Sequence, residues 1–516
     1  MKILLLFPPD WLPSEPYLSL PALTSVLRPA GLSSDAEEAK NILRGEKFYD
    51  IDNLEWATNT LHQTMAHISL GYYPAQICFP PIETDLAYKP FMSSEILEAL
   101  DDDQVNIYRD VYQQLIAPVM KKEKPEMIGV SIVQQKQIIP TFTFSKMIKE
   151  EFPNVHITVG GNIVTRLRDE LKTQVKLFSY IDSAILYEGE NAYLQLVDAI
   201  ENSKPLSELP NLIYRDESGI HTNKDVCSED LSKLPPPDFD GLALEKYFVP
   251  KLILPFLATR GCYWGRCTFC DHFQGYVEGF RTMQVDQIIG ELRFLQNKYN
   301  TRYFHFTDES YPPALFRKLS QRIVEEKLDI VWTTHMRFEE TLLDEQVWKD
   351  AHASGCRYLH FGFESGNQRV LKLMDKATKL DAIETNLRMS SEAGIWNHIM
   401  GFFGFPGETR EEAEDSKCFV LKNREHVHSL GFMTYVLGKY SPVAFEPEKY
   451  GVSYYKNPEW DLAMDYYFTL KEGLNIQEAL SVFEEFERNH DPKWDLRTCV
   501  REYVCLYIDH FGNNNL

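Results

Sequence analysis

Short apolar runs alternate along this chain with longer segments in which apolar residues recur every three or four positions. The first pattern is typical of buried β-strands and the second of amphipathic helices. It predicts strands at 127–132, 156–159 and 183–186, and helices at 141–151, 166–174 and 191–200. Strands that alternate with helices form a parallel sheet covered on both faces, so we expect an α/β domain of the Rossmann-like (doubly wound) kind.

The same alternation resumes after residue 250 and predicts five or six further strand–helix units. The expected strands are 252–257, 303–306, 330–334, 358–363 and 396–403, and the expected helices are 285–298, 313–326, 344–353, 368–374, 380–393 and 410–422. Such a series predicts a partial (β/α)6 TIM-like barrel, with its site at the carboxyl ends of the strands.

The two ends of the chain follow the pattern less well. Residues 1–7 predict a first strand and residues 20–27 a helix, but no run supplies the second strand of a doubly wound sheet. A helical insert at about 33–125 is expected instead, with aromatic and proline-rich interruptions at 72–74 and 79–81. Helices predicted at 461–472 and 476–488 make the C-terminal region mostly helical.

Proline-containing segments at 206–210 and 234–238 have the composition of linkers, and a hairpin is predicted between them at 211–214 and 219–222. These segments mark the boundaries of the expected domains. They are a Rossmann-like domain at 1–205, a hairpin and linker at 206–250, a barrel at 251–445 and the mostly helical C-terminal region at 446–516.

Composition narrows the class of protein. With 44% hydrophobic and 25% charged residues the chain has the composition of a globular protein. The balance of 53 basic against 76 acidic residues gives a net charge of −23, which disfavours a nucleic-acid partner. No run reaches the ~18 apolar residues of a membrane span, and residues 1–7 lack a signal peptide's long apolar core. Six of the nine cysteines are scattered singly, which favours a reducing cytoplasm.

The other three cysteines form the clearest metal-binding signal. Cys262, Cys267 and Cys270 lie within nine positions, in a glycine-containing loop after the strand at 252–257. A zinc site needs a fourth ligand at comparable spacing, whereas three thiolates suit an iron–sulfur cluster with one iron left open. The only fourth ligands that a zinc module could recruit are distant ones such as His272 or Cys356. We expect the first to be an ordinary loop histidine and the second a buried small hydrophobe.

On this loop and the strand ends that follow it, the chain resembles radical S-adenosylmethionine (SAM) enzymes with an N-terminal cobalamin (B12)-binding domain. Those enzymes carry three cysteines after the first barrel strand, with an aromatic residue just before the last one, here Phe269. Four residues separate the first two cysteines, where the commonest family spacing has three, and this resembles cobalamin-dependent branches. The resemblance implies a [4Fe–4S] cluster on Cys262, Cys267 and Cys270, SAM at the open iron, and cobalamin as a further cofactor.

The resemblance also assigns residues at later strand ends to SAM. These are Asp308, Glu309 and Ser310 for the methionine amine, Arg337 for the carboxylate, Glu364 and Ser365 as a SAM-contacting motif, and Gly404 on the adenine side. Plain structural alternatives stay open for three of them: a helix cap for Asp308, an ion pair for Arg337 and a turn for Gly404.

A further set falls where related domains surround cobalamin. It consists of Pro8, Ser131, Gly160, Gly161, Glu188, Gly189 and Glu190. The glycines are equally typical of tight turns, and the sequence has no Asp-x-His-x-x-Gly motif that would supply an axial histidine. The missing second strand leaves open a shortened domain that binds cobalamin weakly or has lost it.

The implied function is that of a cobalamin-dependent radical SAM enzyme, a C-methyltransferase that acts on an unactivated carbon through a 5′-deoxyadenosyl radical and methylcobalamin. Two alternatives stay open: a radical rearrangement or oxidation without methyl transfer, and a non-catalytic metal-stabilised module. The expected partners are a small-molecule or peptide substrate and an electron donor such as flavodoxin or ferredoxin. The sequence does not identify the substrate or a catalytic residue.

Overall fold

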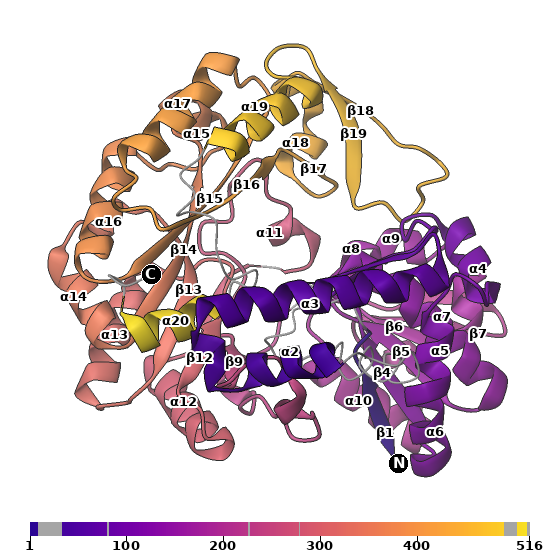
Figure 1. Ribbon diagram of the computed structural model, residues 1–516. Coiled ribbons are helices and arrows are strands. Elements are labelled where there is room, and N and C mark those ends of the chain that lie inside the picture. The colour runs from indigo at the N-terminus through magenta and orange to yellow at the C-terminus, as the bar shows by residue number, and fades with distance from the viewer. Residues whose placement is uncertain (9–33, 80–81, 225–227, 278, 490–502, 513–516) are drawn as a thin grey trace.

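The computed structural model describes residues 1–8, 34–79, 82–224, 228–277, 279–489 and 503–512. It contains two six-stranded sheets, an N-terminal one and a barrel-like one, which lie at opposite sides of the view in Figure 1. The helix predicted at 20–27 falls outside the described residues.

The N-terminal sheet has the strand order β1-β4-β5-β6-β7-β8. Its strands are β1 (Ile3–Leu6), β4 (Met127–Ser131), β5 (His156–Gly160), β6 (Ser183–Ile185), β7 (Leu212–Asp216) and β8 (Gly219–Thr222). The first four are parallel and the last two form an antiparallel extension. Its helices after β4 are α7 (Ile138–Glu151), α8 (Asn162–Arg166), α9 (Arg168–Leu171) and α10 (Glu190–Glu201). Among the described residues β1 is an edge strand, so the second strand that the sequence lacks is also lacking here.

A helical layer is inserted between β1 and β4. It comprises α2 (Ser34–Arg44), α3 (Ile51–Ser69), the short hairpin β2 (Gln76–Cys78) and β3 (Glu83–Asp85), then α4 (Ser93–Asp101), α5 (Tyr108–Val111) and α6 (Ala117–Glu123). Asp50 starts α3 because its side chain accepts a hydrogen bond from the backbone of Asn53 at 3.0 Å. In Figure 1, α3 runs from the barrel to the N-terminal sheet.

The second sheet is the partial (β/α)6 barrel that the sequence predicts. All its strands are parallel, in the order β9-β12-β13-β14-β15-β16. They are β9 (Ile253–Phe256), β12 (Tyr303–Phe306), β13 (Val331–Arg337), β14 (Cys356–Glu364), β15 (Trp396–Phe403) and β16 (Ser429–Thr434). The helices around them are α12 (Val285–Tyr299), α13 (Pro313–Glu325), α14 (Glu345–Ala353), α15 (Gln368–Leu373), α16 (Leu380–Glu392) and α17 (Arg410–Lys422).

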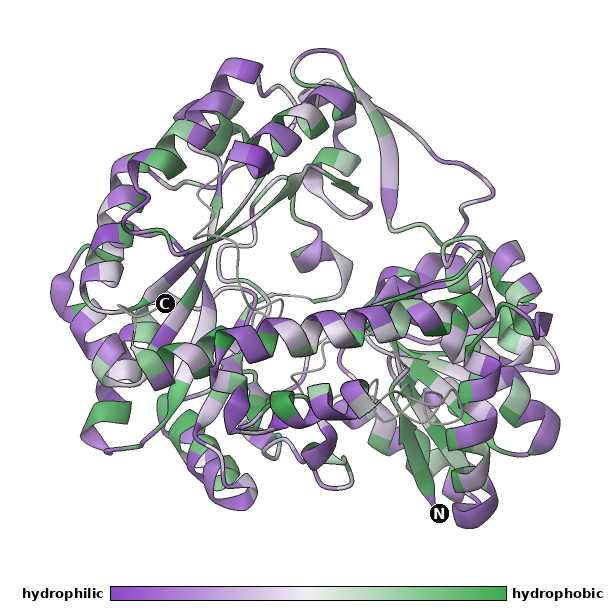
Figure 2. Cartoon of the chain, in the orientation of Figure 1, coloured by the Kyte–Doolittle hydropathy of each residue, from purple (hydrophilic) through white to green (hydrophobic). Residues whose placement is uncertain are grey.

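Alternate residues of the barrel strands face the helices and form an apolar core. Trp332 of β13 packs on Phe316 of α13, and Phe361 of β14 packs on Trp348 of α14. Figure 2 shows hydrophobic residues along the strands and hydrophilic ones on the outer side of helices such as α17. The far end of the barrel is closed by α20 (Tyr503–Phe511), whose Asp509 accepts a hydrogen bond from Tyr303 at 2.8 Å.

The prediction of a helix at 461–472 is wrong. Part of that segment is β19 (Asp465–Leu470), which pairs with β17 (Leu437–Gly438) and β18 (Val452–Tyr455) in an antiparallel sheet. Exposed and half-buried residues alternate along β19, and a period of two is the pattern of a strand with one covered face. The described part of the C-terminal region therefore contains strands as well as helices, and α19 (Ile476–Asn489) is close to its predicted position.

The segment between β18 and β19 reaches the N-terminal half. The Asp461 carboxylate accepts hydrogen bonds from the backbone and hydroxyl of Ser93, at 2.8 and 2.6 Å, and from the amide of Gln174 at 2.8 Å. The connection between these two strands thus bridges the two halves of the molecule (Figure 1). Within the described residues, none of the helices has the length and apolar character of a membrane span.

Candidate functional site

The three-cysteine loop leaves the carboxyl end of β9 as a small hairpin. Strand β10 (Thr259–Arg260) pairs with β11 (Arg281–Thr282), and α11 (His272–Gly275) follows the third cysteine. Gly261 has φ +80°, and a Cβ there would lie 2.2 Å from the carbonyl oxygen of Gly279. Only glycine permits this close approach at the base of the loop.

The loop is fastened to the segment after α15. The Thr268 backbone donates to the Met374 carbonyl at 2.9 Å, and its hydroxyl donates to Leu373 at 3.1 Å. The indole of Trp264 donates to the Asp375 carbonyl at 2.8 Å. The positions of the cysteines are thus set by contacts made several strands later in the chain.

Two buried cations lie beside Cys267. Nη1 of Arg337 is 3.7 Å from its sulfur, and the same guanidinium stacks on Trp264 at 4.4 Å. Burial raises the pKa of the Cys267 thiol, while the charges of Lys376 and Arg337 act in the opposite direction. Each cation also has a carboxylate: Glu339 for Arg337, at 3.0 Å, and Glu364 for Lys376, at 2.6 Å.

This donor set fits an iron–sulfur cluster. Three sulfur ligands come from one short loop, and the neighbouring cations suit the negative charge of a thiolate-bound cluster. In the described part of the chain, no three His, Cys, Asp or Glu side chains are arranged around a single metal ion. Thiolates that each bind a different iron of a cube stand farther apart than the ligands of one ion.

The two distant zinc ligands that were considered are poorly placed. Cys356 starts β14, whereas Glu364, whose charge acts on Cys267, ends it. At about 3.3 Å per residue the two ends of this strand are well over 20 Å apart. Nδ1 of His272 lies 2.9 Å from Glu309, so this ring nitrogen already has an acidic partner.

Asp308 is fully buried and supports the loop. Its carboxyl accepts hydrogen bonds from the Thr259 hydroxyl at 2.6 Å and from the Ala258 backbone at 3.4 Å. Burial raises the pKa of Asp308 to about 7. It therefore ties the end of β12 to the start of the cysteine hairpin, a positioning role that differs from both the SAM contact and the helix cap considered above.

The raised pKa makes stability depend on pH. Between about pH 4 and pH 7 the folded protein holds a proton on Asp308 that the unfolded chain has released, so the free energy of unfolding should fall as pH rises. Relative to Asp308→Asn, we expect a fall of up to about 1.4 kcal/mol per pH unit, which levels off above pH 7. Urea unfolding of both proteins from pH 5 to 8 measures this difference. A difference that stays constant with pH would refute the assignment.

Glu309 and Ser310 follow Asp308 but have different surroundings. Glu309 binds His272 and accepts a hydrogen bond from the Tyr276 hydroxyl at 2.5 Å. Burial raises the pKa of Glu309, but these two partners outweigh it and hold the pKa below its usual value. The Ser310 hydroxyl is buried and has no hydrogen-bond partner in the described residues, so it is available to a ligand.

The two residues assigned to SAM at the end of β14 make different contacts. Glu364 ends the strand at φ +64°, and its side chain points to Lys376. Ser365 is fully buried, and its hydroxyl lies 3.2 Å from that of Ser416, so it joins the strand to α17. Phe269, from the cysteine loop, packs edge-on against Phe402 at 5.0 Å. No pattern in the sequence points to Lys376, which lies in an irregular loop.

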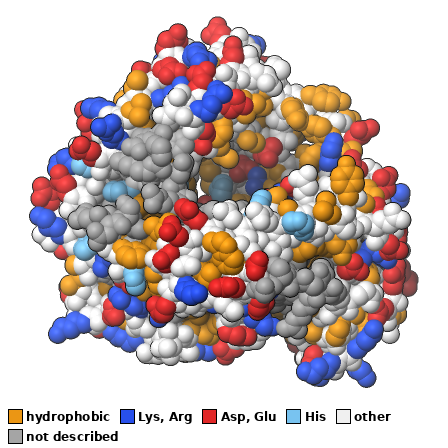
Figure 3. All heavy atoms as spheres, viewed as in Figure 1, with side chains coloured by type: hydrophobic (Ala, Val, Ile, Leu, Met, Phe, Trp, Pro, Cys, Tyr) orange, Lys and Arg blue, Asp and Glu red, His pale blue; other side chains and the backbone are white. Residues whose placement is uncertain are grey.

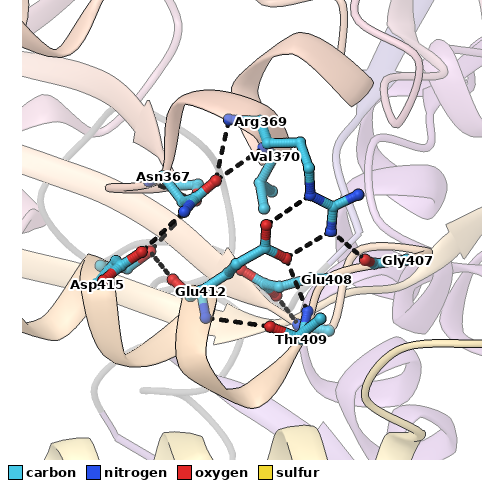
Figure 4. A network of polar contacts seen from close by, with 11 residues as sticks. Asn367, Arg369, Val370, Gly407, Glu408, Thr409, Glu412 and Asp415 are labelled. Atoms are coloured by element: carbon cyan, nitrogen blue, oxygen red, sulfur yellow. Dashed lines mark hydrogen bonds and ion pairs between the residues drawn. The ribbon is translucent and has the colours of Figure 1, made fainter.

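Gly404 lies in a turn that the buried carboxyl of Glu408 holds in place. Figure 4 shows Glu408 next to the polar contacts of Arg369 and Glu412. The N–H of Gly404 donates to Glu408 at 2.6 Å, and burial raises the pKa of Glu408 to about 7. Beside this turn, Arg369 donates to the carboxylate of Glu412 and to the Gly407 carbonyl at 2.6 Å. These contacts make the turn a rigid rim for the carboxyl end of β15.

The N-terminal sheet presents its own carboxyl edge to this region. Pro8 is buried after β1 and its carbonyl accepts a hydrogen bond from Gln137 at 3.3 Å, while Ser131 and Gly160 are paired at the ends of β4 and β5. Gly161 has φ +102°, and a Cβ there would lie 2.3 Å from the Ile132 carbonyl oxygen. Backbone packing alone therefore requires this glycine.

The two neighbouring glycines provide a matched pair of variants. Gly161→Ala is expected to lower the free energy of unfolding by about 2 kcal/mol or more, because of its left-handed backbone and the clash with Ile132. For Gly160→Ala the nearest atom is 3.6 Å away, so we expect a change within about 0.5 kcal/mol. Urea unfolding compares the two, and equal losses would contradict this explanation.

Glu188 and Glu190 have partners in the cysteine hairpin. Glu188 is buried against Arg281, with one contact at 2.9 Å, and Glu190 lies 2.5 Å from Arg260. The two arginines are register partners in the β10–β11 pair. The acidic pair around Gly189 thus docks the N-terminal sheet onto the hairpin that carries the cysteines, a role that sequence reasoning missed.

A second contact joins the two halves beside the third cysteine. Arg166, at the end of α8, is ion-paired with Asp271, which directly follows Cys270. Asn162, at the start of α8, has a buried side-chain oxygen that accepts no hydrogen bond from the described residues. Figure 3 shows a hollow in the middle of this face, with histidine, basic and acidic side chains on its wall.

Comparisons with known proteins agree with this geometry. Residues 256–419 match the radical SAM superfamily. The chain is 29% identical over 319 residues to an uncharacterized methyltransferase of Pyrococcus horikoshii, covering 60% of this chain and 66% of that protein. It is 23% identical over 306 residues to an anaerobic magnesium-protoporphyrin IX monomethyl ester cyclase of Rubrivivax gelatinosus, covering 57% and 53%. The chain thus spans less than two thirds of the length of these two relatives.

Among solved structures, the chain matches the radical SAM methyltransferase TsrM of Kitasatospora setae, solved with cobalamin and a [4Fe–4S] cluster. The TM-score is 0.57 at 16% identity, and the match covers 78% of this chain and 86% of the other. The two proteins share a fold over this part of the chain.

Proposed function

We propose that this radical SAM enzyme is a cobalamin-dependent C-methyltransferase that acts on an unactivated carbon of a small molecule or peptide. One observation supports the proposal most strongly: the sheet edge proposed to bind cobalamin packs against the hairpin proposed to bind the cluster. The carboxyl edge of the N-terminal sheet binds the cysteine hairpin through Glu188 and Glu190, and it contacts the residue after Cys270 through Arg166. A group held at one edge is therefore close to a group held at the other.

Different residues of this chain are proposed to bind the cluster and SAM. Cys262, Cys267 and Cys270 are proposed to bind the cluster, with Arg337 and Lys376 balancing its charge. Ser310 and the β14 end at Glu364 are the proposed SAM contacts. When bound, the cluster supplies the electron that cleaves SAM, and cobalamin carries the methyl group to the substrate.

The ion pairs in the structure change the set of residues that we propose as cobalamin contacts. Glu188 and Glu190 are engaged with arginines, so we propose Ser131, Gly160 and the free oxygen of Asn162 as the polar contacts of the corrin amides. Asn162 is the observation in favour of a fit, because a buried acceptor without a donor is otherwise unfavourable. An electron donor of the flavodoxin or ferredoxin type is proposed as the partner that reduces the cluster.

The products of SAM test this proposal without knowledge of the substrate. Protein reconstituted anaerobically with iron, sulfide and hydroxocobalamin is incubated with SAM and a chemical reductant, and the products are measured by mass spectrometry. We expect both 5′-deoxyadenosine and S-adenosylhomocysteine, the latter in proportion to bound cobalamin. Formation of 5′-deoxyadenosine alone would contradict methyl transfer and favour the rearrangement or oxidation, in line with the cyclase name of one relative.

A further inference from the structure

Four histidines lie side by side inside the barrel. They are His305 on β12, His335 on β13, His360 on β14 and His398 on β15. The last three are register partners on adjacent strands, with ring centroids 4.7 and 5.3 Å apart, and His305 lies 6.1 Å from His360. We refer to these four residues as the histidine layer.

The histidine layer faces the inside of the barrel because of strand alternation. Residues directly next to these histidines, such as Phe304, Met336 and Phe361, pack in the outer core against the helices. Beneath the layer lie Tyr303, Tyr358 and Trp396, in the same cluster as residues of α20. The layer therefore has an apolar floor, and its other side faces the end of the barrel that carries the cysteines.

Polar groups around the layer are hydrogen-bond donors with no competing carboxylate. At this level the inward positions of β12 to β16 are the four histidines, Thr333 and Ser429, and none of them is acidic. The Thr333 hydroxyl is buried and has no partner within the described residues, and Ser429 lies 2.8 Å from Nδ1 of His398. The acidic groups toward the cysteines, Glu339 and Glu364, are already paired with cations.

Between the layer and the cysteine loop the strands carry glycines in place of larger side chains, and the Lys376–Glu364 ion pair packs over one of them, Gly362. Position 362, two residues after His360, is a glycine, and so is position 431, two residues after Ser429. A Cβ at Gly431 would lie 2.8 Å from Nε2 of His398, so a larger residue would press on this imidazole. The wall of the hollow in Figure 3 carries histidine, basic and acidic side chains.

We propose that the histidine layer binds an oxyanionic group of the substrate, a carboxylate or a phosphate, which enters the barrel from the cysteine end. Imidazole N–H groups and the Thr333 hydroxyl donate to the oxygens, and a histidine that takes up a proton balances the charge. The four histidines are not arranged as ligands of one metal ion, which separates this site from a metal centre in the described residues. The inference rests on the proposed function, since it places the substrate of that reaction.

Anion binding tests the layer independently of catalysis. Inorganic phosphate and acetate are titrated separately into the reconstituted protein by calorimetry, which distinguishes the two kinds of anion. His360→Gln and His335→Asn are each expected to weaken binding by about tenfold or more, because each removes a charge-assisted hydrogen bond. The control is His67→Gln, on the exposed side of α3, which should bind as the wild type does.

The outcomes separate this inference from the proposed function. Circular dichroism and the thermal midpoint show whether each variant is folded. If one of the two variants does not fold, the other one still tests the site. Wild-type protein that cleaves SAM but binds neither anion would overturn the histidine layer as a site and leave the proposed reaction standing. Equal anion affinity in the wild type and both folded variants would overturn it as well.

Discussion

Cys267→Ala is expected to lose the visible absorbance of the iron–sulfur cluster and to reduce 5′-deoxyadenosine formation to the level of a protein-free reaction. The reason is that each thiolate holds one iron, and the loop has no spare sulfur: beyond the three cysteines of the motif, the nearest candidates lie on other elements. Iron and sulfide analysis, the absorption spectrum and product formation measure the loss.

Cys418→Ala is the matched control, because Cys418 is exposed on α17 and far along the chain from the loop. It should keep the full cluster content and the rate of the wild type. Retention of the cluster and of SAM cleavage in Cys267→Ala would show that Cys267 is not a ligand.

Lys376→Met is expected to lower the free energy of unfolding by about 3–5 kcal/mol and to impair cluster assembly. The ion pair between Lys376 and Glu364 is buried, with side chains 5% and 12% exposed, and loss of the cation leaves an uncompensated carboxylate in the interior. Urea unfolding measures the first effect, and iron content after reconstitution measures the second.

The double variant Lys376→Met with Glu364→Gln distinguishes charge from shape. Without the buried charge, most of the lost stability should return, whereas cluster assembly should stay impaired because Cys267 has lost one of its two neighbouring cations. If the double variant is as unstable as the sum of the two single variants, the pair is not coupled and this account of the loop support is wrong.

The elements of the barrel could be predicted because their apolar periods were regular. Strands β12 and β15 and helix α17 lie at the predicted residues, and the cysteine loop follows β9 as expected. Strand β16 was not predicted, since its short segment contains Gly431 and has no clear apolar run. At β19 the aromatic residues alternate between an exposed and a covered face, and this period of two was mistaken for a helical one.

The partners of the site residues could not be predicted, because they come from distant parts of the chain. Glu188 contacts Arg281 across the two halves, and Lys376 reaches Glu364 from a loop in which Asp375 and Ala377 have left-handed backbone angles. A signal for the histidine layer did exist. A histidine stands inside, or for His335 directly after, each of four consecutive predicted strands, and equal positions on parallel strands bring such residues together.

The central claim is that one molecule holds both an iron–sulfur cluster and cobalamin at docked edges. The most direct measurement is the anaerobic absorption spectrum, with iron, sulfide and cobalt analysis, of protein reconstituted with iron, sulfide and hydroxocobalamin and then freed of unbound cofactor. This account predicts a cluster and cobalamin in comparable amounts in the wild type, and cobalamin without the cluster in Cys267→Ala. A wild-type protein that retains the cluster but no cobalamin would contradict it.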